Sequence, residues 1–387
     1  MRILIKNANI FNNESCKFDN GSIFVADEKI TDIGYGTTCG STEYEYVIDA
    51  KNMLVIPGFC DVHTHGRAGY DFNDANENEM QIMSESYLHS GVTSIMPTLA
   101  SAPLEKLFSS SDAINKIKGR EKGARFLGVH LEGRYINPLK RGAHAPELIK
   151  PLDPNEMEKL VHRMCLPCHI SAAFELDKNG EFLKRAKALG ATLSLAHTMA
   201  TYDEALDILK RGNVGFTHLY NAMPPIHHRD GGAVCVALTE GAYSELICDG
   251  MHVSAPMIKL AYMALGDGRV VLITDSMQAT GCVDGEYTIA GMPVTVKNSV
   301  ALTHDGALAG STLSLIDGFN NYMRFCGVSL ERAINAATLN PTKMTGTDKF
   351  VGSLNIGKYA DMLFVEYNKK QIKINKVIKG GGVIDFA

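Results

Sequence analysis

Short apolar runs alternate with amphipathic stretches through the middle of the chain. From about residue 56 to 345, each apolar run of strand length precedes a segment whose apolar residues recur at helical spacing. This order predicts parallel strands joined by helices. The predicted strands cover 54–63, 92–98, 126–131, 168–174, 192–196, 214–218, 245–249 and 270–274. Eight strands of this kind predict an α/β fold, a (β/α)8 barrel of the TIM type.

Two helix starts support this assignment. Thr201 and Glu204 have the spacing of a capping box and come directly after the strand that ends near His197. Asp153 offers a helix N-cap, with proline at the first helical position and Glu156 three residues further on. The segments between these predicted strands therefore begin as helices do.

The two ends of the chain have a different pattern. Residues 1–55 alternate short strand-like runs with turns, and 21–25 and 29–33 flank a hairpin-like turn. The C-terminal end has the same pattern, with strand-like runs at 360–365 and 377–379 that are separated by polar and glycine-rich turns. We expect a small β-sandwich domain built from residues 1–55 and 346–387, beside a barrel domain of residues 56–345.

Composition is that of a globular protein with a large core. The chain has 387 residues, of which 45% are apolar and 21% charged. The net charge of −5 comes without a basic block, which argues against nucleic-acid and membrane-surface partners. No apolar run is long enough to span a bilayer. The N-terminus resembles a strand and lacks the features of a signal peptide.

The nine cysteines are scattered, mostly in apolar contexts such as those of Cys60, Cys235, Cys248 and Cys326. An odd, scattered set predicts reduced thiols and a cytoplasmic location. Cys165 and Cys168 form a CxxC, which can serve redox or zinc chemistry. No second CxxC follows, so we favour a structural role for this pair.

Residues with metal-binding chemistry stand where the predicted strands end. In order they are His63, His65, Glu132, His197, His218, Asp249 with His252, and Asp275. Barrels of this kind carry their catalytic residues at the carboxyl ends of the strands. A single histidine there is more often structural, but a series on successive strands favours one shared site. Two residues apart on a strand, His63 and His65 project to the same face.

These residue types suit a divalent transition metal such as zinc or iron. Glu132, His197 and His218 offer one carboxylate and two imidazoles. His63 and His65 can complete a second site, with Glu132 bridging the two ions. Asp275 stands apart, as a general base beside an activated water would. Its other interpretations are a further metal ligand or a helix N-cap.

The motif PGFCDVHTHG at 57–66 resembles the opening of the amidohydrolase superfamily. Three motifs narrow the resemblance to the N-acetylglucosamine-6-phosphate deacetylase family: GVHLEG at 128–133, HLYNAM at 218–223 and DGMH at 249–252. TDSM at 274–277 and LAGS at 308–311 agree with it. The resemblance covers essentially the whole chain, including a closing motif at 352–361 that is shared across the superfamily.

This resemblance implies metal-dependent hydrolysis of the acetamide of N-acetyl-D-glucosamine 6-phosphate, giving D-glucosamine 6-phosphate and acetate. It makes Glu132, His197 and His218 the metal ligands common to the family. Some members replace the first-strand pair and bind one ion, whereas this chain keeps His63 and His65, so one or two zinc or iron ions per subunit are implied. Asp275 would be the catalytic acid and base, and His252 would polarise the acetyl carbonyl.

The resemblance also implies a substrate pocket and a partner. Asn221, Ala222 and Arg229 would hold the sugar phosphate, with the arginine reaching in from the neighbouring subunit of a homodimer. A guanidinium suits bidentate phosphate binding. The remaining implied pocket residues are Ala143, His144, Asp249, His252, Leu308, Ala309 and Gly310.

Two alternatives stay open. One is another metal-dependent amidohydrolase that acts on a different N-acyl or cyclic amide. The loop at 221–229, which the resemblance assigns to phosphate binding, is the feature that distinguishes the two interpretations. Relatives that bridge two metals with a carboxylated lysine carry it on the fourth strand, and 168–174 has no lysine, which disfavours the dihydroorotase and hydantoinase interpretations. The second alternative is a non-enzymatic assembly protein on the same fold, which would be expected to have lost some of the ligands.

Overall fold

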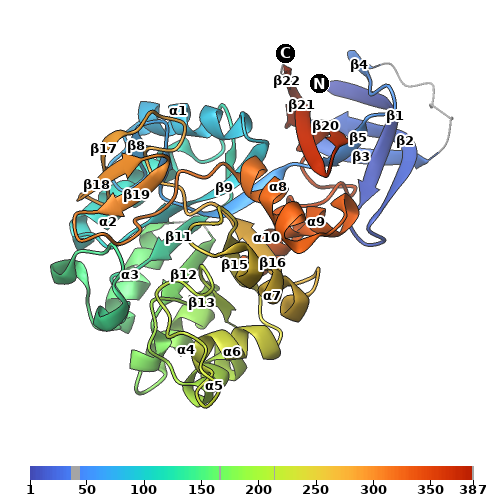
Figure 1. The fold of residues 1–387 in the computed structure, drawn as a ribbon. Coiled ribbons are helices and arrows are strands. Elements are labelled where there is room, and N and C mark those ends of the chain that lie inside the picture. Colours follow the sequence, from blue (N-terminus) through green and yellow to red (C-terminus); the bar gives the residue numbers. More distant parts are fainter. Residues whose placement is uncertain (36–43, 165–166, 213, 386–387) are drawn as a thin grey trace.

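A ring of parallel strands forms the centre of the molecule in the computed structural model, which describes residues 1–35, 44–164, 167–212 and 214–385 (Figure 1). The strands are β6 (Phe59–Thr64), β9 (Val92–Leu99), β11 (Val129–Glu132), β12 (Cys168–Ala172), β13 (Thr192–Leu195), β14 (Gly215–Phe216), β15 (Ser244–Ile247) and β16 (Val270–Ile273). Each pairs in parallel with its neighbour in that order, and short β10 (Arg125–Phe126) also pairs with β9. The predicted (β/α)8 barrel is confirmed.

The ring closes between its last and first strands. Thr64 and Ser276 form a parallel bridge, and the Asp275 amide donates to the carbonyl of His63 at 3.0 Å. Buried Asp61 ties the same strands together, because its Oδ2 accepts from the Thr274 hydroxyl at 2.6 Å. This closure brings the end of β16 beside the end of β6.

Helices surround the ring. They are α1 (Glu77–Leu88), α2 (Leu104–Ile117), α3 (Pro154–Met164), α4 (Glu181–Ala188), α5 (Tyr202–Gly212), α6 (Gly232–Thr239), α7 (Ala255–Leu265), α8 (Leu315–Cys326), α9 (Leu330–Ala337) and α10 (Leu339–Met344). Both predicted helix starts are confirmed. Glu204 Oε2 accepts from the Thr201 amide at 2.9 Å while Thr201 Oγ1 accepts from the Glu204 amide at 3.3 Å. Asp153 Oδ1 accepts from the amides of the first turn of α3.

Strands from both ends of the chain form one separate eight-stranded sheet, which confirms the predicted β unit. They are β1 (Arg2–Asn12), β2 (Lys17–Ala26), β3 (Lys29–Tyr35), β4 (Tyr46–Asp49), β5 (Leu54–Pro57), β20 (Met362–Asn368), β21 (Gln371–Lys379) and β22 (Gly382–Asp385). Buried apolar side chains from both ends pack together there, among them Ile5, Ile23 and Phe364. The antiparallel pairing of β5 with β20 joins the two ends.

The prediction of one strand over 54–63 is wrong. The chain leaves the terminal sheet after β5 and enters the barrel as β6, with the break at Gly58. A Cβ at Gly58 would lie 2.1 Å from Thr93 Oγ1, so only glycine fits this close passage. The Gly58 amide donates to Asp361 on the terminal-sheet side, and the next amide donates to Gly91 on the barrel side, each at 3.0 Å.

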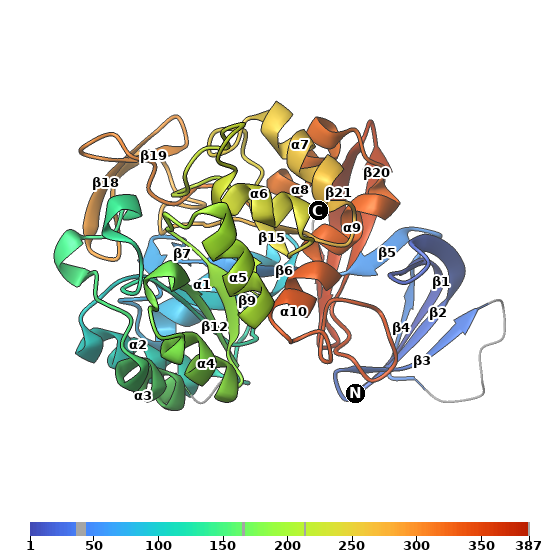
Figure 2. The same cartoon turned by 90° about the horizontal axis from the view of Figure 1, so that it is seen from below.

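An unpredicted three-stranded antiparallel sheet lies between β16 and α8. It consists of β17 (Gly285–Ile289), β18 (Met292–Lys297) and β19 (Val300–Thr303) and packs Ile289, Val294 and Val296 against Met277. Figure 1 and Figure 2 place it on the side of the barrel opposite the terminal sheet. A small hairpin, β7 (Gly66–Arg67) with β8 (Tyr70–Asp71), follows β6. No helix in the described ranges is both long and apolar enough to cross a membrane.

Candidate metal centre and active site

The predicted ligands converge at the carboxyl ends of the barrel strands. His63 is the second-last residue of β6, and Glu132 is the last residue of β11. His197 lies two residues after the end of β13, and His218 lies two residues after the end of β14. His197, His218 and Asp275 have positive φ angles of 45°, 31° and 50°. Non-glycine residues rarely take this conformation, and it is concentrated at functional sites. Here it lets the chain turn sharply at the strand end while the side chain still faces the barrel axis.

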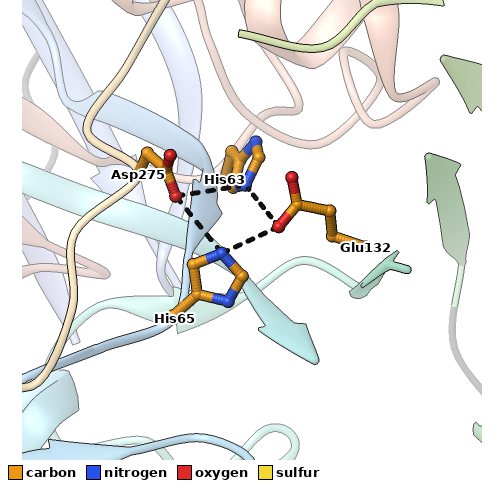
Figure 3. Close-up of side chains that lie close together, drawn as sticks. All are labelled: His63, His65, Glu132 and Asp275. Atoms are coloured by element: carbon orange, nitrogen blue, oxygen red, sulfur yellow. Dashed lines mark ion pairs between the residues drawn. The ribbon is translucent and has the colours of Figure 1, made fainter. Parts of the chain in front are cut away.

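One buried cluster joins the first-strand pair to two carboxylates, as Figure 3 shows. His65 Nε2 lies 3.0 Å from Glu132 Oε2 and 3.2 Å from Asp275 Oδ1. His63 Nε2 lies 3.4 Å from each of the same two oxygens. All four residues are buried, and one ligand atom from each falls within a sphere that a single cation can share.

A second cluster shares Glu132 with the first. Glu132 Oε1 lies 3.0 Å from His218 Nε2 and 3.3 Å from His197 Nε2. The two histidine nitrogens are themselves only 3.1 Å apart. Glu132 therefore presents one carboxylate oxygen to each cluster, which is the arrangement of a residue that can bridge two ions.

The hydrogen bonds around the clusters match metal ligands. His197 Nδ1 lies 2.7 Å from the Lys140 carbonyl oxygen, which only accepts, so Nδ1 carries a proton and Nε2 is the ring nitrogen that faces Glu132. His63 has a similar arrangement, with Nδ1 2.9 Å from Glu245 Oε2 and a buried Nε2 that has no hydrogen-bond partner among the described residues. Buried polar atoms rarely stay unpaired. Ring nitrogens as close as His197 Nε2 and His218 Nε2, 3.1 Å apart beside a carboxylate oxygen, fit a divalent cation.

Both carboxylates are ionised. Burial raises the pKa of the Asp275 carboxyl, but His63 and His65 outweigh this effect and lower its pKa to about 2. Burial opposes ionisation of Glu132 in the same way, and the surrounding imidazoles hold its pKa well below the ordinary value. Burial lowers the pKa of His65, but its hydrogen bonds to Asp275 and Glu132 outweigh burial and raise that pKa to about 9, so a cation that binds here displaces a proton from the ring.

A cavity of about 500 Å³ opens beside both clusters, within the size range of small-molecule sites. The predicted residues on its wall, besides the metal ligands, are Asp275, Ala143, His144, Asn221, Ala222, His252, Leu308 and Gly310. Lys140, Arg141 and Asp305 also line it, and none of these was predicted. The Arg141 guanidinium pairs with the Asp305 carboxylate at 3.3 Å, which joins the loop after β11 to the segment after β19.

Three other predicted residues lie elsewhere. Asp249 does not line the cavity but orients His252, whose Nδ1 is 2.6 Å from Asp249 Oδ2. Ala309 is fully buried in the core of the three-stranded sheet. Arg229 is exposed on the loop before α6 and does not line the cavity.

Of the CxxC pair, Cys168 is described by the structure, and it does not line the cavity. Cys165 lies outside the described residues. Cys168 is buried in β12, and burial raises the pKa of its thiol to about 12, so it carries no ready thiolate.

Two groups that form hydrogen bonds with the ligands were not predicted from the sequence. The Lys140 carbonyl belongs to the backbone and has no signature in the sequence. Glu245 stands in an otherwise apolar strand, Ser244–Ile247, and a charged residue in such a buried strand was the available signal.

Comparisons with known proteins extend over nearly all of the chain. Residues 54–384 match the amidohydrolase family. The N-acetylglucosamine-6-phosphate deacetylase of Bacillus subtilis (strain 168) is 34% identical over 94% of this chain and 93% of its own. The N-acetylgalactosamine-6-phosphate deacetylase of Escherichia coli O157:H7 is 34% identical over 83% of this chain and 85% of its own. The crystal structure of N-acetylglucosamine-6-phosphate deacetylase from Pasteurella multocida superposes with a TM-score of 0.90 at 26% identity, covering 100% of both chains.

Proposed function

This chain belongs to the amidohydrolase family, and we propose that it hydrolyses the acetamide of N-acetyl-D-glucosamine 6-phosphate, giving D-glucosamine 6-phosphate and acetate in the catabolism or recycling of amino sugars. The observation that carries the proposal is the pair of buried ligand clusters joined by Glu132 and open to a cavity of about 500 Å³. Relatives that span nearly the same length and act as amino-sugar 6-phosphate deacetylases support the choice of substrate.

The imidazole and carboxylate ligands suit one or two zinc or iron ions per subunit: Glu132, His197 and His218 would hold the first, and the first-strand cluster would hold a second. Such an ion supplies Lewis acidity, which lowers the pKa of water and polarises a carbonyl. An amide needs both effects, because it is a poor electrophile and water is a poor nucleophile.

Asp275 moves the proton. Its ionised carboxylate lies at the edge of the cavity and takes a proton from water as the water oxygen attacks the acetyl carbon. When the carbon–nitrogen bond breaks, Asp275 returns that proton to the departing amine. The carboxyl is then again ionised, and acetate and the free amino sugar leave.

His252 stabilises the charge that develops on the acetyl oxygen. Its Nδ1 donates to Asp249 at 2.6 Å, so the ring is held with Nε2 on the side of the cavity. Nε2 then donates a hydrogen bond to the oxyanion of the tetrahedral intermediate, with the Asp249 carboxylate at the other ring nitrogen.

The phosphate is bound far from the reacting amide, and this remote binding orients the substrate. Asn221 and Ala222 line the cavity, while Arg229 lies exposed beyond it. We propose that the protein is a homodimer, in which Arg229 of the partner subunit reaches the phosphate. The unpaired, buried Cys60, Cys168, Cys248 and Cys326 support a cytoplasmic enzyme.

Acetate release from three sugars tests the proposal: N-acetylglucosamine 6-phosphate, N-acetylgalactosamine 6-phosphate and unphosphorylated N-acetylglucosamine. We expect the first to be turned over with the highest kcat/KM. Equal kcat/KM for the phosphorylated and unphosphorylated sugars would favour an amidohydrolase with another substrate. Protein purified without metal, inactive and not restored by zinc or iron, would favour the non-enzymatic alternative.

A further inference from the structure

A buried carboxylate lies behind the metal ligands, on the side away from the cavity. Glu245 belongs to β15 and has no exposed surface. Its Oε2 accepts a hydrogen bond from Nδ1 of His63 at 2.9 Å and from the backbone amide of His218 at 3.1 Å. Among the described residues, His63 is its only ion-pair partner.

A fully buried carboxylate is costly unless it is hydrogen-bonded or charge-paired. No lysine or arginine offsets the charge of Glu245 within the described residues, and its Oε1 has no hydrogen-bond partner. Its remaining effect is on His63. A carboxylate at Nδ1 holds a proton on that nitrogen, so Nε2, which lies 3.4 Å from Glu132 Oε2 and Asp275 Oδ1, is the nitrogen placed to bind an ion.

His63 and His218 depend on Glu245 to different degrees. In the part of the chain that the structure describes, Glu245 is the only acceptor at Nδ1 of the His63 ring. His218 contacts the Glu245 side chain only through its own backbone amide. A second hydrogen bond fixes the same segment, in which the Leu219 amide donates to the Glu245 carbonyl at 2.8 Å. That second bond uses the backbone of residue 245 and survives any change of its side chain.

We propose that Glu245 is a positioning residue that fixes the tautomer and ring orientation of His63, and so sets the affinity of the first-strand cluster for its ion. The proposal rests on the metal-dependent function above and adds to it a residue outside the ligand set. The proposal also predicts that the metal affinity of the cluster of Glu132, His197 and His218 depends much less on Glu245.

The test is calorimetric titration of the metal-free, full-length protein with zinc. Glu245→Leu removes the acceptor, Glu245→Gln keeps an acceptor of nearly the same shape, and Ser244→Ala is the control on an equally buried neighbour. We expect two binding steps in the wild type and in the control. In Glu245→Leu the step of the first-strand cluster should weaken by about 10- to 100-fold, and less in Glu245→Gln.

A second set of variants, made in a His63→Asn/His65→Asn protein, shows which binding step belongs to the first-strand cluster. In a His63→Asn/His65→Asn protein the first-strand ion is already absent, so adding Glu245→Leu should change the remaining step little. Thermal unfolding of each metal-free variant checks that it folds, and Glu245→Gln carries the test if Glu245→Leu does not fold.

Three results would overturn the proposal. They are unchanged zinc binding in folded Glu245→Leu, equal weakening of both steps, and further weakening in the His63→Asn/His65→Asn background. These readouts do not depend on turnover. A wild-type protein that binds two ions without releasing acetate would refute the proposed function and leave the assignment of Glu245 intact.

Discussion

Replacing Asp275 with asparagine separates two roles that the structure allows this residue. Asp275 Oδ1 lies 3.2 Å from His65 Nε2 and 3.4 Å from His63 Nε2, so it can act as a base or as a fourth ligand. Asparagine has nearly the same shape and keeps an oxygen at this position. It cannot take up a proton and carries no charge. Asp275→Asn therefore removes the base while it retains most of the contact with the cluster.

The expected loss follows from the chemistry of a positioned base. General acid–base catalysis contributes about 10²- to 10⁴-fold. Neighbouring imidazoles hold the pKa of Asp275 at about 2, so it is ionised at neutral pH but is a weak base. We therefore expect a decrease in kcat of about 10²- to 10³-fold, equivalent to about 3–4 kcal/mol of transition-state stabilisation.

The assay combines acetate release with metal analysis of the same protein sample. We expect kcat to fall while KM and metal content stay close to those of the wild type. Turnover within about tenfold of the wild type at full metal content would refute the role of Asp275 as the base. Loss of one ion together with activity would show instead that Asp275 acts first as a ligand.

Four further predictions test the metal centre, the phosphate site, the domain junction and the barrel interior. His63→Asn/His65→Asn should lower metal content toward one ion per chain and leave some activity; loss of all metal would make the first-strand pair the primary site. Arg229→Ala should raise KM for the phosphorylated sugar far more than for the unphosphorylated one, and equal effects would contradict its phosphate role. Gly58→Ala should destabilise the protein by about 1–3 kcal/mol in urea unfolding, because its Cβ would meet Thr93 Oγ1 at 2.1 Å, and Thr93→Ala should relieve part of the loss. Burial lowers the pKa of His169 from 6.5 to about 4, so below pH 6.5 the unfolded chain binds a proton at this residue that the folded chain does not bind. This difference lowers the free energy of unfolding by up to about 3 kcal/mol as the pH falls to 4. The pH dependence of unfolding should therefore be weaker in His169→Gln, and an unchanged pH dependence would contradict the prediction.

The barrel was predictable from the sequence because each strand is an apolar run that ends in a polar residue. Parallel strands bring their carboxyl ends to one edge, so a list of strand-end residues already indicated which side chains meet. The separation of β5 from β6 was not predictable in this way. No polar residue interrupts the chain between Leu54 and Cys60, and the reason for the break is the contact between Gly58 and Thr93, which are distant in sequence. The sheet of β17–β19 was not predicted because its strands are short, four to six residues each, and β18 alternates buried with exposed positions.

The two ligand clusters differ in what fixes their histidines, and this difference bears on how many ions the site holds. His197 donates to a backbone carbonyl, that of Lys140, which every residue at that position would provide. His63 donates to a side chain, that of Glu245, which a single substitution removes. Sequence motifs identify ligands by residue type and cannot show which acceptor sets the tautomer of each ring. If Glu245 acts as proposed, the presence of His63 and His65 alone does not establish a second ion in this barrel, because the carboxylate behind His63 is also needed for tight binding.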